Sequence, residues 1–136
     1  MLFKNILRLL GMQIYTIPVD SFREQFGDMA SMEWRVVKVQ TPRGMIQTYK
    51  TYPIEKVRCI TDSGLPVTIN IKPSLEMRIT DHLGKRTIFY FDRICVENDI
   101  LTGHQSRKLG FIQKTIALSD ISKIEIQDGK KYYRYL

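Results

Sequence analysis

The chain has 136 residues, of which 43% are apolar and 26% are charged. This length predicts one domain with a substantial core, and the composition excludes a disordered or fibrous chain. The net charge is +7, so the surface attracts anions, and no uninterrupted apolar run approaches the roughly 20 residues of a transmembrane helix.

The first twelve residues, MLFKNILRLLGM, predict a short amphipathic helix or a shortened signal peptide. A secretory signal needs about seven apolar residues in its central region, and Arg8 interrupts the run here. The candidate membrane-contacting side chains are Leu2, Phe3, Ile6, Leu7 and Leu10. The alternative is a helix that packs on its own domain.

Residues 13–136 predict a single β-rich domain. A first strand is expected at residues 13–17, followed by a short helix that Asp20 or Ser21 caps, with Glu24 completing a capping box. Phe22, Phe26 and Met29 would share one helical face. Strands are then expected at residues 32–40, 45–52, 54–61 and 65–71, with turns at residues 41–44 and 62–64.

Residues 77–91 predict the central β-hairpin, because two runs of strand-forming residues flank a turn with Asp81 and Gly84. The strand is expected to continue through a bulge at residues 92–93. Further strands are expected at residues 94–96, 100–103, 111–117, 123–127 and 130–136, with one helical turn at residues 118–121. Asp128 followed by glycine is a strong hairpin signal.

Short strands separated by turn signals favour a small barrel or a sandwich. We therefore expect a mainly β fold, an antiparallel small barrel that is SH3-like in its C-terminal half, with one or two short N-terminal helices.

Catalytic and metal-binding patterns are weak. Cys59 and Cys95 lie in strand-like runs without metal-ligand spacing, and both are expected to behave as small buried hydrophobes, although a disulfide stays open. His82 and His104 are expected in solvated turns or loops, and no nucleophile elbow accompanies them. The aspartates are expected to serve in turns and caps. The sequence therefore predicts no catalytic, cofactor or metal site.

Basic clusters are the stronger functional signal. The candidate contacts to an anion or partner are Lys85, Arg86, Arg93, Arg107, Lys108, Lys114, Lys130, Lys131 and Arg134. They could bind single-stranded nucleic acid, with nearby aromatic rings as stacking platforms. They could instead bind anionic lipid or an envelope polymer, or form a solvated face whose lysines protect edge strands.

The second half of the chain resembles a family of short uncharacterised proteins from Bacteroidales-type bacteria. The resemblance rests on the stretches PSLEMRIT at residues 73–80, KRTIFYFDRI at 85–94 and LSDISKIEIQDGKK at 118–131. Members often begin with a lipoprotein signal, so the resemblance implies a location in the cell envelope. In this chain Met12 stands at the position of the lipidated cysteine, and the resemblance implies no activity.

These observations predict a non-enzymatic β module, associated with the cell envelope or the periphery of a membrane, with a protein-interaction or structural role. Its partner would be a protein or another envelope component, and no cofactor or small-molecule substrate is implied. The alternative is a cytosolic basic barrel that binds nucleic acid.

Overall fold

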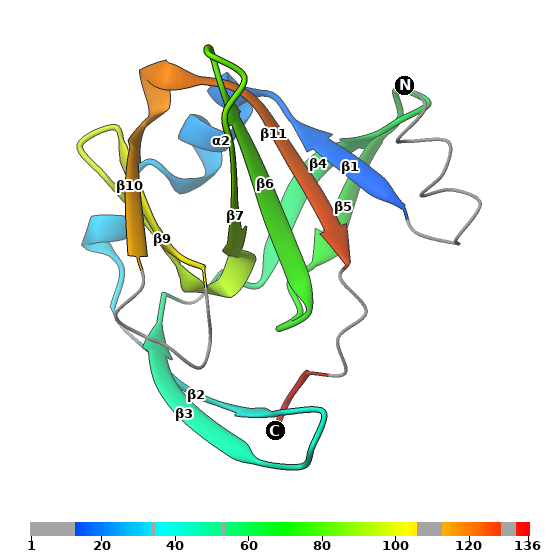
Figure 1. The fold of residues 1–136 in the computed structure, drawn as a ribbon, viewed down its shortest axis with the longest axis vertical. Coiled ribbons are helices and arrows are strands. Elements are labelled where there is room, and N and C mark those ends of the chain that lie inside the picture. Colours follow the sequence, from blue (N-terminus) through cyan, green and yellow to red (C-terminus); the bar gives the residue numbers. More distant parts are fainter. Residues whose placement is uncertain (1–12, 34, 53, 106–112, 129–132) are drawn as a thin grey trace.

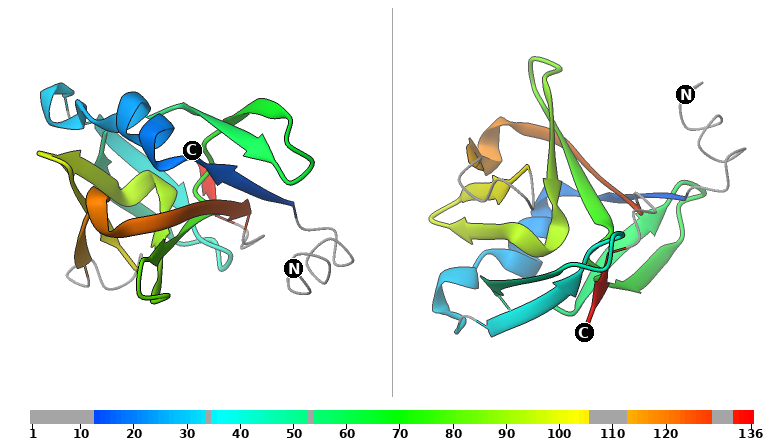
Figure 2. Two further views of the ribbon diagram at one scale, coloured as in Figure 1. Left: turned by 90° about the horizontal axis from the view of Figure 1, so that it is seen from above. Right: turned by 60° about the horizontal axis from the view of Figure 1, so that its bottom comes forward.

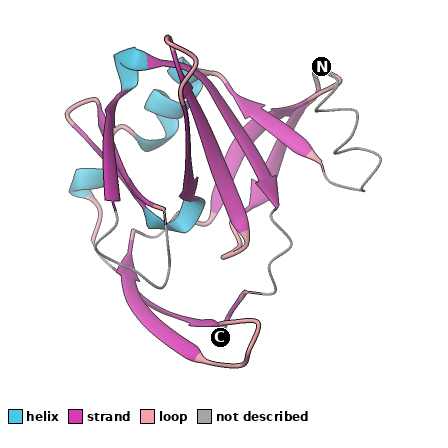
Figure 3. Cartoon of the chain, in the orientation of Figure 1, coloured by secondary structure: helices cyan, strands magenta, loops and turns pink. Residues whose placement is uncertain are grey.

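The computed structural model describes residues 13–33, 35–52, 54–105, 113–128 and 133–136. It is mainly β, with antiparallel sheets and one α-helix in the described chain (Figures 1 and 3), as the sequence predicts. The largest sheet has the strand order β5 (Pro66–Asn70), β4 (Lys56–Thr61), β1 (Ile14–Ile17), β11 (Ile121–Asp128), β6 (Leu75–Asp81) and β7 (Arg86–Tyr90).

Two smaller sheets complete the described fold. One has the order β10 (Gln113–Ala117), β9 (Ile100–His104) and β8 (Ile94–Glu97). The other has the order β12 (Arg134–Tyr135), β2 (Arg35–Gln40) and β3 (Ile46–Thr51). The described strands do not close into a barrel, since β5 and β7 are open edges of the large sheet, so the barrel and the SH3-like half are not confirmed.

Three hairpins share one turn chemistry, and they confirm the predicted turns. The turns occupy residues 41–45, 61–65 and 81–85, and each contains a glycine with positive φ: Gly44 at 83°, Gly64 at 91° and Gly84 at 85°. The first side chain of each turn accepts the backbone N–H four residues later: Thr41 from Met45, Thr61 from Leu65 and Asp81 from Lys85. A type I turn followed by a left-handed glycine suits a short hairpin loop.

The predicted hairpin after Asp128 is wrong. Strand β11 pairs with β1 on one side and with β6 on the other, so neither of its edges can accept the C-terminal strand. Strand β12 pairs with β2 instead, where Tyr135 lies opposite Val39. Residues 129–132 lie outside the described chain.

The helix α2 (Val19–Phe26) forms where expected, but the predicted capping box is wrong. The helix begins after Pro18, which makes no side-chain cap hydrogen bond. Asp20 lies in the first turn, 3.0 Å from Arg23, and the Ser21 hydroxyl accepts a hydrogen bond from Gln25. Both side chains therefore contact other side chains of the helix and do not cap its N-terminus.

In the described residues, three single-turn 3-10 helices connect the other elements: η1 (Met29–Ser31), η2 (Phe91–Arg93) and η3 (Leu118–Asp120). The last confirms the helical turn expected at residues 118–121. The second replaces the bulge expected at residues 92–93, because the chain turns from the large sheet into β8 at this point.

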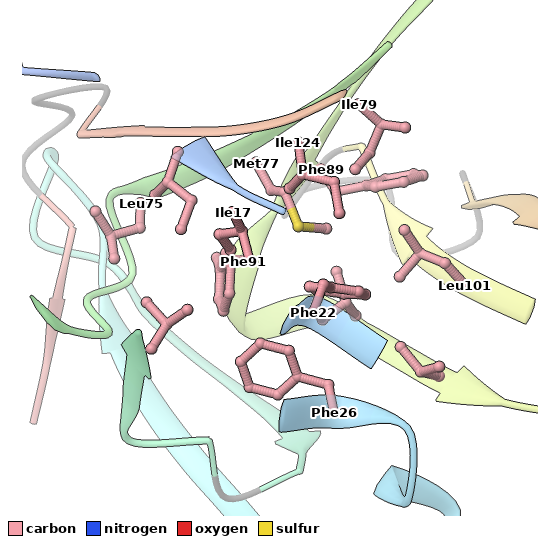
Figure 4. Close-up of a cluster of buried hydrophobic side chains, with 14 of the residues drawn as sticks. Ile17, Phe22, Phe26, Leu75, Met77, Ile79, Phe89, Phe91, Leu101 and Ile124 are labelled. Carbon is pink, nitrogen blue, oxygen red and sulfur yellow. The ribbon is translucent and has the colours of Figure 1, made fainter. Parts of the chain in front are cut away.

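The core lies between the large sheet, α2 and the sheet of β8–β10 (Figures 2 and 4). The helix contributes Phe22 and Phe26, whose ring centroids are 5.0 Å apart, and Phe26 meets Phe91 at 5.8 Å. Phe89 and Phe91 are fully buried, and Met29 joins the helical pair in the core.

Candidate binding site

The predicted cations that lie within the described residues do not gather into one patch. Arg86 is exposed on β7, Arg93 ends η2, and Arg134 on β12 donates a hydrogen bond to Gln40. Of the predicted cations in the described part of the chain, only Lys85 and Lys114 are brought together. The remaining predicted contacts lie outside the described residues: Arg107, Lys108, Lys130 and Lys131 among the cations, and Leu2, Phe3, Ile6, Leu7 and Leu10 in the N-terminal segment.

Lys85 and Lys114 line a recess of about 200 Å³ between the β6–β7 turn and β10. The Lys114 ammonium donates a hydrogen bond to the Thr87 hydroxyl at 3.2 Å, and the neighbouring Lys85, together with burial, lowers the pKa of Lys114 below its ordinary value. Asp81 and Asp120 line the same recess, so the charges in it are balanced.

A larger cleft, of about 630 Å³, lies between the end of β3 and the outer face of the sheet formed by β8, β9 and β10. Side chains alternate along these strands, so Ile94 and Val96 enter the core while Cys95 faces outward. The polar side chains that line the cleft include Lys50, Arg93, Glu97, Thr102, His104 and Gln113. The volume lies in the range of ligand sites.

The cationic end of the cleft is built from three segments that are distant in sequence. Arg93 is the last residue of η2, and its Nη2 lies 3.4 Å from Nδ1 of His104 on β9. The guanidinium carbon of Arg93 lies 4.5 Å from the centre of the Tyr49 ring, a cation–π contact that holds the arginine in place. Lys50 on β3 lines the same cleft.

The other side of the cleft contains a phenol and a thiol that hydrogen-bond to each other, Tyr52 and Cys95. This hydrogen bond, together with burial and electrostatic interactions with Cys95 and Glu97, raises the pKa of Tyr52 from 10.0 to about 12. Tyr52 therefore stays protonated at neutral pH and cannot take a proton from the thiol.

We expect alkaline titration to reveal this hydrogen bond. Tyr52 should ionise near pH 12 in the folded protein, whereas the unfolded chain releases the same proton near pH 10. Because the folded pKa is the higher one, the resulting stability is complete below pH 10 and is lost as the pH rises through 12. The ultraviolet absorbance of tyrosinate, compared between the wild type and Tyr52→Phe, measures this pKa.

The control for that titration is Cys95→Ala, which removes the hydrogen-bond partner and should bring the pKa of Tyr52 down towards 10. An unchanged titration in this variant would show that another interaction protects the phenol.

The structure corrects three interpretations of single residues. Cys95 is a half-buried free thiol in the cleft, whereas Cys59 is a buried free thiol as expected, so the two do not form a disulfide. His104 is half-buried in the cleft and does not lie in a solvated loop. Asp92 is only 4% exposed and its carboxylate accepts hydrogen bonds from Tyr49 and Tyr135, whereas the aspartates are expected to serve in turns and caps. His82 does lie in the exposed turn, where Nε2 is 3.0 Å from the Ser119 carbonyl oxygen.

Sequence reasoning missed Lys50 and Tyr52, because the cleft is assembled by tertiary contacts that no local pattern encodes. Among the described residues, no cluster of His, Cys, Asp and Glu is arranged to hold a metal ion. The described helices include none with the length and apolar character needed to cross a membrane. Comparisons with protein-family models, curated proteins and solved structures find no match.

Proposed function

We propose that the protein is a non-enzymatic binding module of the cell envelope or membrane periphery, whose cleft holds an acidic segment of a protein partner. The observation that carries the proposal is the contact between Arg93 and His104, which lie 3.4 Å apart in a cleft that Lys50 also lines. Charged side chains from separate segments define a surface that recognises complementary charge.

The walls of the cleft suit a peptide. Strand β3 has β2 as its single neighbour among the described strands, so its other edge can accept an extended segment by strand addition. Thr102 and Gln113 offer polar groups on the facing sheet, and Ile100 offers apolar surface. A carboxylate of the bound segment would meet Arg93 in a charge-assisted hydrogen bond.

The arrangement of the thiol supports a non-enzymatic role. A catalytic cysteine needs a neighbouring base or cation that favours the thiolate. The hydrogen-bond partner of Cys95 is the phenol of Tyr52, which stays protonated at neutral pH and therefore has no free base to accept the thiol proton. The imidazole of His104 instead lies beside the guanidinium of Arg93.

The alternative function, nucleic-acid binding by a basic barrel, receives less support. Single-stranded nucleic acid stacks its bases on exposed aromatic rings. Phe89 and Phe91 are fully buried, the Tyr90 ring packs against that of Tyr133, and the Tyr135 hydroxyl binds Asp92. Most of these described aromatic residues are thus buried or engaged in ring packing, while Tyr135 keeps 37% of its surface exposed.

A labelled oligoglutamate peptide tests the proposal. We expect it to bind the full chain, and Arg93→Gln should weaken the affinity by about tenfold, because a hydrogen bond between two charged groups contributes about 1.5–3 kcal/mol. Arg86→Gln is the matched control, since it removes the same charge from an exposed site on β7. Fluorescence anisotropy measures both affinities.

The two thiols report where the peptide binds. Occupation of the cleft should slow the alkylation of Cys95, measured by mass spectrometry, and should leave the buried Cys59 unaffected. Equal loss of affinity in both arginine variants, or peptide binding that leaves Cys95 unprotected, would place the binding outside the cleft and refute the proposal.

A further inference from the structure

The sheet formed by β12, β2 and β3 is built from segments without acidic residues. Residues 35–52 contain Arg35, Lys38, Arg43 and Lys50 but no Asp or Glu, and residues 133–136 add Arg134. All 14 acidic residues of the chain therefore lie outside these two segments. Arg35 is paired with Glu55 at 3.4 Å, so the remaining cations, Lys38, Arg43, Lys50 and Arg134, supply the positive potential of this sheet.

Strand register places most of these cations on one face of the sheet. Lys38 pairs with Thr48, Val36 with Lys50 and Ile46 with Gln40, so these side chains point to the same side. Gln40 also pairs with Arg134 of β12. We call this side, together with Arg43 and Met45 of the connecting turn, the hairpin face.

The opposite side of the same sheet belongs to the body of the protein. Val39 is fully buried there, and Thr51 is 5% exposed. Figure 1 and the right view of Figure 2 show the β2–β3 hairpin at one end of the molecule, away from most of the large sheet. The hairpin face is therefore accessible to a broad, flat partner.

The hairpin face also exposes aliphatic side chains among its cations. Val36 is 58% exposed, Met45 is 64% exposed and Ile46 is 60% exposed. Cations attract an anionic membrane surface, and aliphatic side chains gain free energy by entering the boundary between head groups and acyl chains. The two kinds of residue lie side by side, as peripheral membrane binding requires.

We propose that the hairpin face docks on an anionic lipid bilayer. This inference rests on the membrane-peripheral location proposed above and does not require the cleft to be occupied. Lipid fits this surface better than nucleic acid does, because its exposed apolar groups are aliphatic. The sheet's aromatic residues Tyr49 and Tyr135 instead turn inward, and both donate hydrogen bonds to Asp92.

Vesicle co-sedimentation of the full chain tests the charged part of the proposal. We expect binding to phosphatidylglycerol–phosphatidylcholine vesicles at low salt, weaker binding at high salt and none to pure phosphatidylcholine vesicles. Lys38→Gln with Arg43→Gln should lower the affinity about 30-fold, since each cation at a membrane surface contributes about fivefold. Lys50 is left intact because it also lines the cleft.

The control for that double variant is Lys56→Gln with Arg86→Gln, which removes the same charge from exposed positions on the large sheet. The control should retain nearly wild-type affinity. If the two double variants weaken binding equally, overall charge is responsible and the hairpin face is not the docking surface.

A matched pair of turn residues tests the apolar part. Met45 and Leu65 follow the glycine of equivalent turns, and they are 64% and 62% exposed. We expect Met45→Ser to lower vesicle affinity by about fivefold, because the variant transfers less apolar surface from water into the membrane when it binds. Leu65→Ser, on the β4–β5 turn, should have little effect. Equal effects of the two substitutions would contradict the docking orientation.

Two further results would overturn the inference. One is loss of vesicle binding in Leu7→Ser with Leu10→Ser while the hairpin variants bind normally, which would assign the contact to the N-terminal segment. The other is binding to a single-stranded oligonucleotide without binding to vesicles. Neither result bears on peptide binding in the cleft, so this inference and the cleft proposal can fail separately.

Discussion

Substitution of Asp92 by alanine is expected to lower the free energy of unfolding by about 3–5 kcal/mol. The carboxylate is 4% exposed, and its Oδ2 accepts hydrogen bonds from the hydroxyls of Tyr49 on β3 and Tyr135 on β12. The backbone carbonyl of the same residue accepts a hydrogen bond from Thr51. Alanine would leave both phenols without their charged acceptor.

The region of the fold that loses stability is a sharper test of the role of Asp92 than the size of the loss. Asp92 joins η2 to the sheet of β12, β2 and β3, so hydrogen exchange should accelerate in β3 and β12 more than in β6 and β11. Asp92→Asn keeps one oxygen acceptor and should be less damaging than alanine. Asp20→Ala, at a carboxylate that is 97% exposed, should cost less than about 1 kcal/mol. Uniform acceleration across all three sheets would contradict this role of Asp92.

Local turn chemistry explains why much of the fold could be predicted. The turns at residues 41–45, 61–65 and 81–85 each combine a Thr or Asp acceptor with a glycine, so the hairpins they close are visible in the sequence. The helical face that carries Phe22 and Phe26 is likewise set by residues that are close together in the sequence. These signals act over a few residues and require no knowledge of the partner strand.

Strand partners that are distant in sequence could not be predicted. The glycine after Asp128 favours a hairpin, yet β11 is already enclosed by β1 and β6, and tertiary pairing overrides the local signal. The same limit applies to the cleft, since Lys50, Arg93 and His104 come to line it only through packing of separate sheets. The charge segregation of residues 35–52, by contrast, is readable in the sequence, because it is the absence of one residue class from a continuous segment.

Gly103 illustrates a constraint that is readable only from the packed structure. A Cβ added at this position would lie 2.5 Å from Cγ of Phe89 and 2.6 Å from Cδ1. Phe89 is fully buried, and Gly103 is paired on both sides, with Ile94 and with Lys114, so neither the ring nor the backbone can move away easily. We expect Gly103→Ala to lower the free energy of unfolding by about 3 kcal/mol, measured by urea denaturation.

A double-mutant cycle separates this steric cause from loss of backbone flexibility. Phe89→Ala alone should cost about 3–5 kcal/mol because it leaves a cavity. In that background the clashing ring atoms are gone, so adding Gly103→Ala should cost little or should fill part of the cavity. Gly84→Ala is the matched control, since its φ of 85° makes alanine unfavourable by about 1–2 kcal/mol although no atom lies within 4 Å of the added Cβ.

The Phe89→Ala background should not rescue Gly84→Ala, because the stability that Gly84→Ala loses arises from the backbone conformation of the turn itself. A contrary outcome is that Gly103→Ala lowers the stability equally with and without the Phe89 ring. That result would show that the backbone conformation of β9 requires the glycine, and that the contact between β7 and β9 does not require it. Rescue confined to Gly103 would instead establish that the small residue permits the close approach of β9 to the large sheet. That approach sets the position of His104, the next residue along β9, and with it the cationic end of the cleft.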